Sequence, residues 1–157
     1  MSECGLPLTY VNQVGGQDEL VFDGGSFVLH RDGALAHLLP FWQESLAIVR
    51  WHERADGWRC DGDARWREEP RLASVYNAMV LGLRDYVRKN GFRGVVLGLS
   101  RGIDSALTAA VAVDALGADR VRGVRLPSCF TSRASLDDAA ESAAMLGMRL
   151  ETLSIES

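Results

Sequence analysis

Residues 94–116 constrain the fold of this chain more than any other stretch. They pass from an apolar run through a Gly/Ser loop into a helical pattern with almost no spacer. Residues 95–97 are a short continuous apolar run, typical of a strand that is buried on both faces of a parallel sheet. Residues 103–116 are mostly Ala, Leu, Val and Thr, and Gly117 then favours a helix C-terminus. The pattern therefore predicts a strand, a tight loop and a helix in immediate succession.

The loop between this strand and this helix has the composition of an anion site. Gly98, Ser100 and Gly102 let the backbone approach a ligand closely, Ser105 adds a second hydroxyl, and Asp104 lies at or near the helix N-cap. Unpaired N–H groups and the positive end of the helix dipole would point at whatever binds in the loop. Phosphate is the ligand best suited to such a site.

The two commonest phosphate motifs do not fit this loop. A Walker A loop would need Gly and Lys at Ile103 and Asp104, and the dinucleotide fingerprint would need glycines at Ser100 and Ile103. The segment Leu99-Ser-Arg-Gly-Ile-Asp-Ser105 instead resembles the Ser-Gly-Gly-x-Asp-Ser pyrophosphate loop of ATP pyrophosphatases, which split ATP into AMP and pyrophosphate. By this resemblance the ATP phosphates are bound by Gly98, Leu99, Ser100, Arg101, Gly102, Ile103, Asp104 and Ser105.

Arg101 departs from that family pattern, because it replaces the first glycine. If the backbone is left-handed at this position, a residue other than glycine costs roughly 1–2 kcal/mol. The side chain would also occupy the space of the pyrophosphate. We therefore expect Arg101 to weaken phosphate binding; the alternative is that an outward-pointing arginine attracts phosphate.

The rest of the chain predicts different secondary structure in its first third and in its last part. The first third predicts short strands at 6–11, 20–23, 26–30 and 46–51, with a turn-rich loop at 12–19. The acidic residues of its Gly-rich turns are expected to form turns rather than a carboxylate site: Asp18, Glu19 and Asp23. The last part predicts helices at 71–89 and 135–146 and further strands at 120–126 and 149–155.

The order strand, helix, strand over residues 95–126 predicts a βαβ unit with parallel strands and a right-handed crossover. Residues 127–132 then follow the carboxyl end of the second strand, where open α/β sheets place their ligands.

Composition excludes several classes of function. The chain of 157 residues has a net charge of −4, and its acidic and basic residues are mixed along the sequence. It therefore lacks the basic patch that is typical of nucleic-acid binding. It lacks an apolar run of membrane-spanning length and a signal peptide, so a cytoplasmic location is expected. Neither a disulfide framework nor a metal site is expected, because no suitable spacing links Cys4, Cys60 and Cys129 or His30, His37 and His52.

Two stretches resemble the same family in the same order. Residues 10–28 look like the late part of the nitrilase-like glutaminase domain of bacterial glutamine-dependent NAD synthetases, and residues 75–155 look like the first half of their synthetase domain. The resemblance implies an α/β fold. The first part would be the C-terminal strands of a nitrilase-like αββα domain. The second part would be the first half of a Rossmann-like, parallel-sheet ATP-pyrophosphatase domain, of the adenine nucleotide alpha hydrolase-like kind. The expected boundaries are 1–52 for the first part, 53–70 for a linker and 71–157 for the second part.

The resemblance also implies a reaction. The family converts nicotinic acid adenine dinucleotide (deamido-NAD) to NAD with ATP and Mg²⁺, and it takes ammonia from glutamine. Small molecules are thus the expected partners, with a homo-oligomer for the full-length family and neither nucleic acid nor membrane. In the family, a loop that matches Leu126, Pro127 and Ser128 lies beside the adenosine. This sequence continues with Cys129 and Phe130, where the family pattern has a basic residue and Tyr.

The catalytic residues are not identifiable in this sequence. The glutaminase Glu, Lys and Cys set lies upstream of the matched segment in the family, so Cys4 is not expected to be the nucleophile, and the metal ligands are expected beyond Ser157. We expect this chain alone to be inactive. Two alternatives remain open at this point: another ATP pyrophosphatase, such as a GMP synthetase or a tRNA-thiolating enzyme, and a non-catalytic remnant that binds nucleotide or only assembles.

Overall fold

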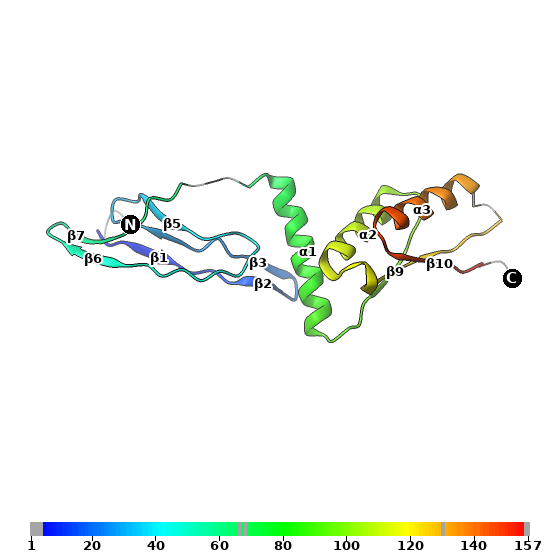
Figure 1. Ribbon diagram of the computed structural model, residues 1–157, viewed down its shortest axis with the longest axis horizontal. Helices are drawn as coiled ribbons and strands as arrows, with labels where there is room; N and C mark the ends of the chain where they lie inside the picture. The colour runs from blue at the N-terminus through cyan, green and yellow to red at the C-terminus, as the bar shows by residue number, and fades with distance from the viewer. Residues whose placement is uncertain (1–4, 66, 68, 130, 156–157) are drawn as a thin grey trace. The chain divides into compact units, whose positions relative to one another are not determined.

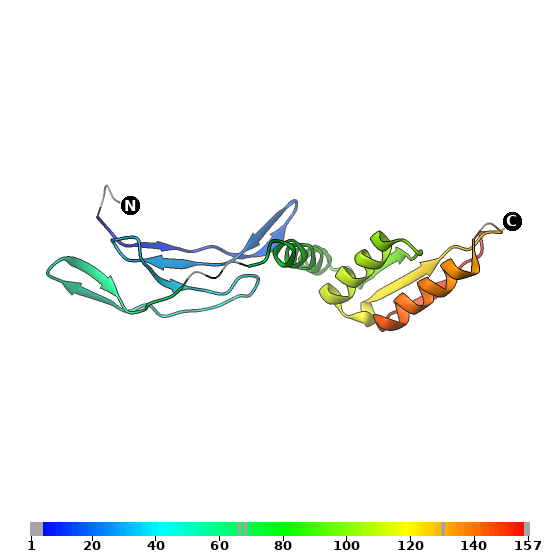
Figure 2. The same cartoon turned by 90° about the horizontal axis from the view of Figure 1, so that it is seen from above.

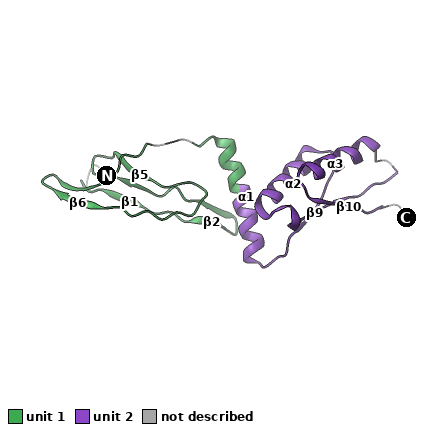
Figure 3. Ribbon diagram, in the orientation of Figure 1, with its two compact units in different colours: residues 1–78 green, residues 79–157 purple. Residues whose placement is uncertain are grey.

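The computed structural model describes residues 5–65, 67, 69–129 and 131–155 (Figure 1). Two residues discussed above, Cys4 and Phe130, lie outside the described residues. The chain divides into two compact units, residues 1–78 and residues 79–157 (Figure 3). Helix α1, Arg71–Lys89, contributes residues to both units.

The first unit is built from short antiparallel strands, as its turn-rich sequence predicts. β4 lies between β1 and β5 in a three-stranded sheet, and β2–β3 and β6–β7 form two hairpins. A small buried core consists of Val28, Ala36 and Cys60. The strands are β1 Leu8–Tyr10, β2 Val14–Gln17, β3 Leu20–Asp23, β4 Phe27–Leu29, β5 Leu35–Leu38, β6 Trp51–Arg54 and β7 Gly57–Cys60.

Two predictions for the first unit are wrong. The predicted loop at 12–19 contains β2, because pairing with β3 overrides the low strand propensity of its two glycines. The predicted strand at 46–51 is absent except for Trp51, and the side chains of Leu46 and Ile48 are 94% and 84% exposed. An apolar run forms a strand only where another strand pairs with it, and no strand among the described residues pairs with 46–50.

The second unit contains a parallel three-stranded sheet in the order β10-β9-β8. Both pairings, β8 with β9 and β9 with β10, are parallel, which confirms the predicted parallel strands. The elements are β8 Val95–Gly98, α2 Ile103–Leu116, the short 3-10 helix η1 Ala118–Arg120, β9 Val121–Arg125, α3 Arg133–Met145 and β10 Arg149–Thr152. The mixed α/β character predicted from the sequence is therefore present.

Helices α2 and α3 pack on one face of this sheet (Figure 2). Alternate strand residues, Val95 and Leu97 of β8 with Leu150 of β10, belong to the same core as the helices. The intervening Val96 is 68% exposed, so the prediction that this strand is buried on both faces is wrong. The helices contribute mainly small residues, which lets them lie close to the strands: Ala109, Ala112, Ala115, Ala139 and Ala143. Close packing here fixes where each helix begins relative to the strand that precedes it.

The helix boundaries follow the sequence signals closely. α1 and α2 span the residues predicted for them, and Gly117 ends α2 with a φ of 89°. α3 begins two residues earlier than predicted, because Ser132 is its N-cap and its hydroxyl accepts a hydrogen bond from the Ser135 N–H at 3.3 Å. The first turn of α3 thereby lies beside the loop that follows β9.

Candidate functional site

The loop after β8 is anchored to the sheet by Leu99. The Leu99 N–H donates to the Val124 carbonyl at 2.9 Å, and its side chain is buried in the core of the second unit. Gly98, the last residue of β8, has open space above it, since a Cβ atom built there would meet no atom within 4 Å. The loop thus leaves the sheet at a fixed point and borders an open space.

Two serine hydroxyls hold the rest of the loop in shape. Ser105 Oγ lies 3.0 Å from Ser100 Oγ and accepts a hydrogen bond from the Ser100 N–H at 3.2 Å. Ser105 also donates to the Gly102 carbonyl at 2.8 Å, and the Gly102 N–H donates to Ser100 Oγ at 3.2 Å. These bonds tie the loop to the first turn of α2.

The amino end of α2 is open to a ligand. Gly102 is the N-cap with an extended backbone and makes no side-chain cap, so Asp104 is a first-turn residue and not the cap. The N–H groups of Ile103, Asp104 and Ser105 belong to the first turn and have no carbonyl partner inside the helix. This is the donor arrangement that the sequence predicts for a phosphate.

The condition under which Arg101 would strain the backbone, a left-handed conformation, is not met. Among the described residues other than glycine, a positive φ occurs only at Asp18 and Trp42. Arg101 therefore adopts a conformation open to any residue, and its guanidinium Nε lies 3.0 Å from Asp138 Oδ2 of α3. The two side chains are 67% and 48% exposed.

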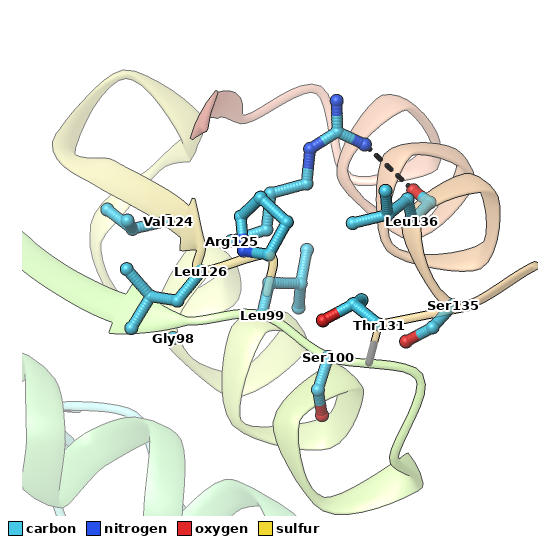
Figure 4. A pocket seen from close by; sticks show the side chains of 10 residues that line it. Gly98, Leu99, Ser100, Val124, Arg125, Leu126, Thr131, Ser135 and Leu136 are labelled. Carbon is cyan, nitrogen blue, oxygen red and sulfur yellow. Dashed lines mark hydrogen bonds between the residues drawn. The ribbon is translucent and has the colours of Figure 1, made fainter. Parts of the chain in front are cut away.

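A cleft of about 370 Å³ opens at the carboxyl ends of β8 and β9 (Figure 4). Of the predicted site residues, Gly98, Leu99, Ser100, Leu126 and Pro127 line it. Arg101 to Ser105 continue from Ser100 into α2, and the Ser128 N–H donates to Thr131 Oγ1 at 2.9 Å. The loop after β8 and the loop after β9, predicted from different parts of the sequence, thus meet at one cleft.

The third wall of this cleft comes from the end of the loop after β9 and the first turn of α3. Thr131 belongs to the segment 127–132 that the sequence predicts at the ligand end of the sheet, whereas Ser135 and Leu136 were not predicted as site residues. Thr131 and Ser135 add two hydroxyl groups, and Leu136 adds apolar surface beside them (Figure 4). The N-cap pattern that begins at Ser132 could have predicted Ser135 and Leu136, because it places the first turn of α3 next to the carboxyl end of β9.

Arg125 lines the cleft, but its guanidinium is engaged elsewhere. Its Nη1 donates to the Leu136 carbonyl at 2.8 Å, as Figure 4 shows, and its Nε donates to Thr152 Oγ1 at 2.7 Å. Arg125 therefore holds α3 and β10 against β9, and the cleft keeps its shape through these bonds.

The described residues do not build a metal centre: none of their His, Cys, Asp and Glu side chains form a group of three or more suited to a metal ion. Of the described cysteines, Cys129 is exposed and Cys60 is buried, and burial raises the pKa of the Cys60 thiol. Cys60 Sγ lies 3.8 Å from His30 Nδ1, far from the cleft in sequence. The raised pKa makes it a poor nucleophile.

Comparison with known proteins identifies relatives along the whole chain. The glutamine-dependent NAD(+) synthetase of Rhodobacter capsulatus is 53% identical over 156 residues, which cover 99% of this chain and 28% of the relative. The glutamine-dependent NAD(+) synthetase of Acinetobacter baylyi is 44% identical over 146 residues, which cover 93% of this chain and 27% of that protein. The chain thus spans about a quarter of the length of the curated relatives that it matches.

Solved structures give the same result. The glutamine-dependent NAD+ synthetase from Acinetobacter baumannii in complex with ADP has a TM-score of 0.89 and 42% identity, covering 99% of this chain and 29% of its own. The NH3-dependent NAD synthetase from Campylobacter jejuni in complex with the nitrate ion has a TM-score of 0.51 and 31% identity, covering 55% of this chain and 38% of its own.

The family model for NAD synthase matches residues 75–157, which include every residue of the cleft. No helix formed by the described residues is long and apolar enough to cross a membrane. Since the match takes in more than half of the chain and its relatives are synthetases over nearly all of it, this chain belongs to the NAD synthase family.

Proposed function

We propose that this chain is a segment of a glutamine-dependent NAD(+) synthetase and supplies part of the ATP site of that enzyme. In the whole enzyme, ATP adenylates the nicotinate carboxylate of nicotinic acid adenine dinucleotide and expels pyrophosphate. Ammonia taken from glutamine then displaces AMP and gives NAD. The observation that carries this proposal is the likeness of 99% of the chain, at a TM-score of 0.89, to an ADP-bound synthetase.

The loop from Gly98 to Ser105 would hold the phosphates of ATP. Its support is the set of donors at the amino end of α2: first-turn N–H groups and the hydroxyls of Ser100 and Ser105. Donors already in place stabilise charge that builds on a leaving pyrophosphate without having to reorganise. Leu126, Pro127 and Ser128 would lie beside the adenosine, which agrees with the exposed apolar surface of Leu126 at the cleft.

Magnesium would enter this site with its substrate, as the ATP complex. The described residues offer no group of carboxylates that could hold the ion by themselves. Mg²⁺ offsets phosphate charge when it is bound to ATP. The contribution of this chain is to donate hydrogen bonds to the phosphates and to shape the cleft around the nucleotide.

We also propose the finer assignment of the fold. Residues 1–52 would be the last strands of a nitrilase-like domain, 53–70 a linker that begins within the β6–β7 hairpin, and 71–157 the first half of a Rossmann-like ATP-pyrophosphatase domain. The parallel order β10-β9-β8, with the cleft at the carboxyl strand ends, supports the last assignment. Relatives that extend over both halves of the chain favour this family over a GMP synthetase or a tRNA-thiolating enzyme.

A chimeric enzyme tests the proposal. The matching segment of the Rhodobacter capsulatus synthetase is replaced by this chain, and NAD formation from nicotinic acid adenine dinucleotide and ATP is measured with glutamine and, separately, with ammonium. We expect NAD with both nitrogen donors, because the segment would fill the same place in the site. A folded chimera that forms NAD with neither donor would contradict the proposal; the unmodified enzyme, purified in parallel, is the control.

A further inference from the structure

The ion pair between Arg101 and Asp138 joins two segments that each contribute lining residues to the cleft. Arg101 follows Ser100, which lines the cleft from the loop after β8. Asp138 lies on α3 one turn after Ser135, which lines the cleft from the opposite side. The 3.0 Å contact between Arg101 Nε and Asp138 Oδ2 therefore links the phosphate loop to α3.

The guanidinium of Arg101 keeps most of its donors available. Among the described residues, Asp138 is the one hydrogen-bond or ion-pair partner recorded for its side chain, and that contact uses Nε. Arg125, which lines the cleft, is committed to the Leu136 carbonyl and to Thr152. A phosphate in this loop would thus find the guanidinium of Arg101 one residue before the N-cap of α2, held only by an exposed carboxylate.

The exposure of the pair makes an exchange of partners inexpensive. Both side chains are about half exposed or more, so the ion pair is screened by water and is weak. A phosphate carries more charge than a carboxylate and accepts bidentate hydrogen bonds from guanidinium. A polyphosphate at the loop would therefore compete well against Asp138 for Arg101.

We propose that Arg101 is a phosphate-binding residue of this chain and that Asp138 competes with the ligand for it. With the cleft empty, Asp138 holds the guanidinium at the α3 wall; a polyphosphate replaces Asp138 as the partner, and release of the ligand restores the ion pair. This inference rests on the proposed function, because it assumes that the loop binds the phosphates. It assigns to Arg101 the opposite effect from the weakening that the sequence suggests.

Calorimetry with magnesium pyrophosphate tests the exchange. Asp138→Asn removes the competing charge, and we expect about two- to fivefold tighter binding, the range that an exposed ion pair spans. Arg101→Gln removes the guanidinium that binds the phosphate, and we expect about tenfold weaker binding of pyrophosphate, as for the loss of a charge-assisted hydrogen bond. In the Arg101→Gln background, Asp138→Asn should restore little, because its effect acts through the guanidinium.

The matched control is Glu151→Gln. It removes a carboxylate of equal exposure, 48%, from the Arg122 pair on β9 and β10, and it changes the net charge by the same amount. Unchanged affinity in this variant and tighter binding in Asp138→Asn would support the exchange. Circular dichroism of each variant verifies that it is folded.

Two failures are distinguishable. If the unaltered chain and Glu151→Gln bind pyrophosphate but Asp138→Asn does not bind it more tightly, or Arg101→Gln binds as well as the unaltered chain, the exchange is wrong and the phosphate site stands. If no folded variant binds pyrophosphate, the phosphate site itself is wrong, and the exchange falls with it. An NMR titration adds an independent readout: the Arg101 Nε–H resonance should move on adding pyrophosphate, toward its position in Asp138→Asn.

Discussion

At the scale of single residues, one hydroxyl keeps the loop ready for a ligand. Ser105 Oγ accepts the Ser100 N–H and donates to the Gly102 carbonyl, so it fixes both sides of the loop at once. Because these bonds exist before any ligand arrives, less conformational freedom is lost on binding. Arg125, which lines the cleft, and Arg101, which follows the lining residue Ser100, differ in their partners: Arg125 has structural partners, whereas Arg101 has an exposed partner that we propose a ligand replaces.

The charge of one residue in the first unit, Asp32, is predicted to make the stability of this unit depend on pH. Asp32 Oδ1 accepts a hydrogen bond from the Ala34 N–H at 3.0 Å in the turn between β4 and β5, and chiefly this bond lowers the pKa of Asp32. A lowered pKa means that the folded state favours the charged carboxylate. The stabilisation is therefore complete above the unfolded pKa, about 4, and is lost as the pH falls through the folded pKa.

The measurement is urea unfolding of the unaltered chain and of Asp32→Asn at neutral and at acid pH. Every tryptophan, at 42, 51, 58 and 66, lies in residues 1–78, so fluorescence reports on this unit. We expect Asp32→Asn to be less stable at neutral pH and the difference to shrink in acid. Glu44→Gln, an exposed site with no hydrogen-bond partner recorded among the described residues, is the control; a difference that grows in acid would contradict the prediction.

At the scale of elements, small residues set the distance of α2 and α3 from the sheet. Ala109 and Ala139 are 0% and 1% exposed, and they occupy positions where a larger side chain would push the helix away. The first turn of α3 lines the cleft, and α2 begins three residues after the lining residue Ser100, so their packing and the shape of the site are linked. Core substitutions here are thus expected to affect the site as well as stability.

Neighbouring alanines of α3 provide a matched test of this packing. Ala143 is buried, whereas Ala144 is exposed, so Ala143→Leu should destabilise the second unit by about 1–3 kcal/mol through overpacking. Ala144→Leu should change the free energy of unfolding by less than about 0.5 kcal/mol. Chemical unfolding followed by helical circular dichroism measures both, and equal effects of the two substitutions would refute the packing argument.

The sequence predicts the second unit better than the first for a physical reason. The bounds of α2 follow from a loop, a run of small residues and a terminal glycine, all of which act locally. β2 and the residues 46–50 could not be predicted in this way, because strand formation depends on a partner distant in sequence. The Arg101–Asp138 pair was missed for the same reason, since it joins residues from two elements.

At the scale of the whole molecule, the cleft depends on the second unit alone. Its lining residues run from Gly98 to Leu136, all within residues 79–157, and they come from the segments after β8 and β9 and from α3. Nucleotide binding by this chain is therefore expected to be measurable.

The most direct test of the central claim is calorimetry of this chain with magnesium ATP, beside Ser105→Ala and Thr108→Ala. Ser105→Ala removes the hydroxyl that shapes the loop, and Thr108→Ala removes a hydroxyl that donates to the Asp104 carbonyl within α2 at 2.7 Å. We predict binding of one ATP, weakened about fivefold by Ser105→Ala because about 1 kcal/mol of hydrogen bonding is lost, and changed little by Thr108→Ala. Absence of ATP binding by the folded chain, or equal affinity in Ser105→Ala, would contradict the assignment of the loop as a phosphate site.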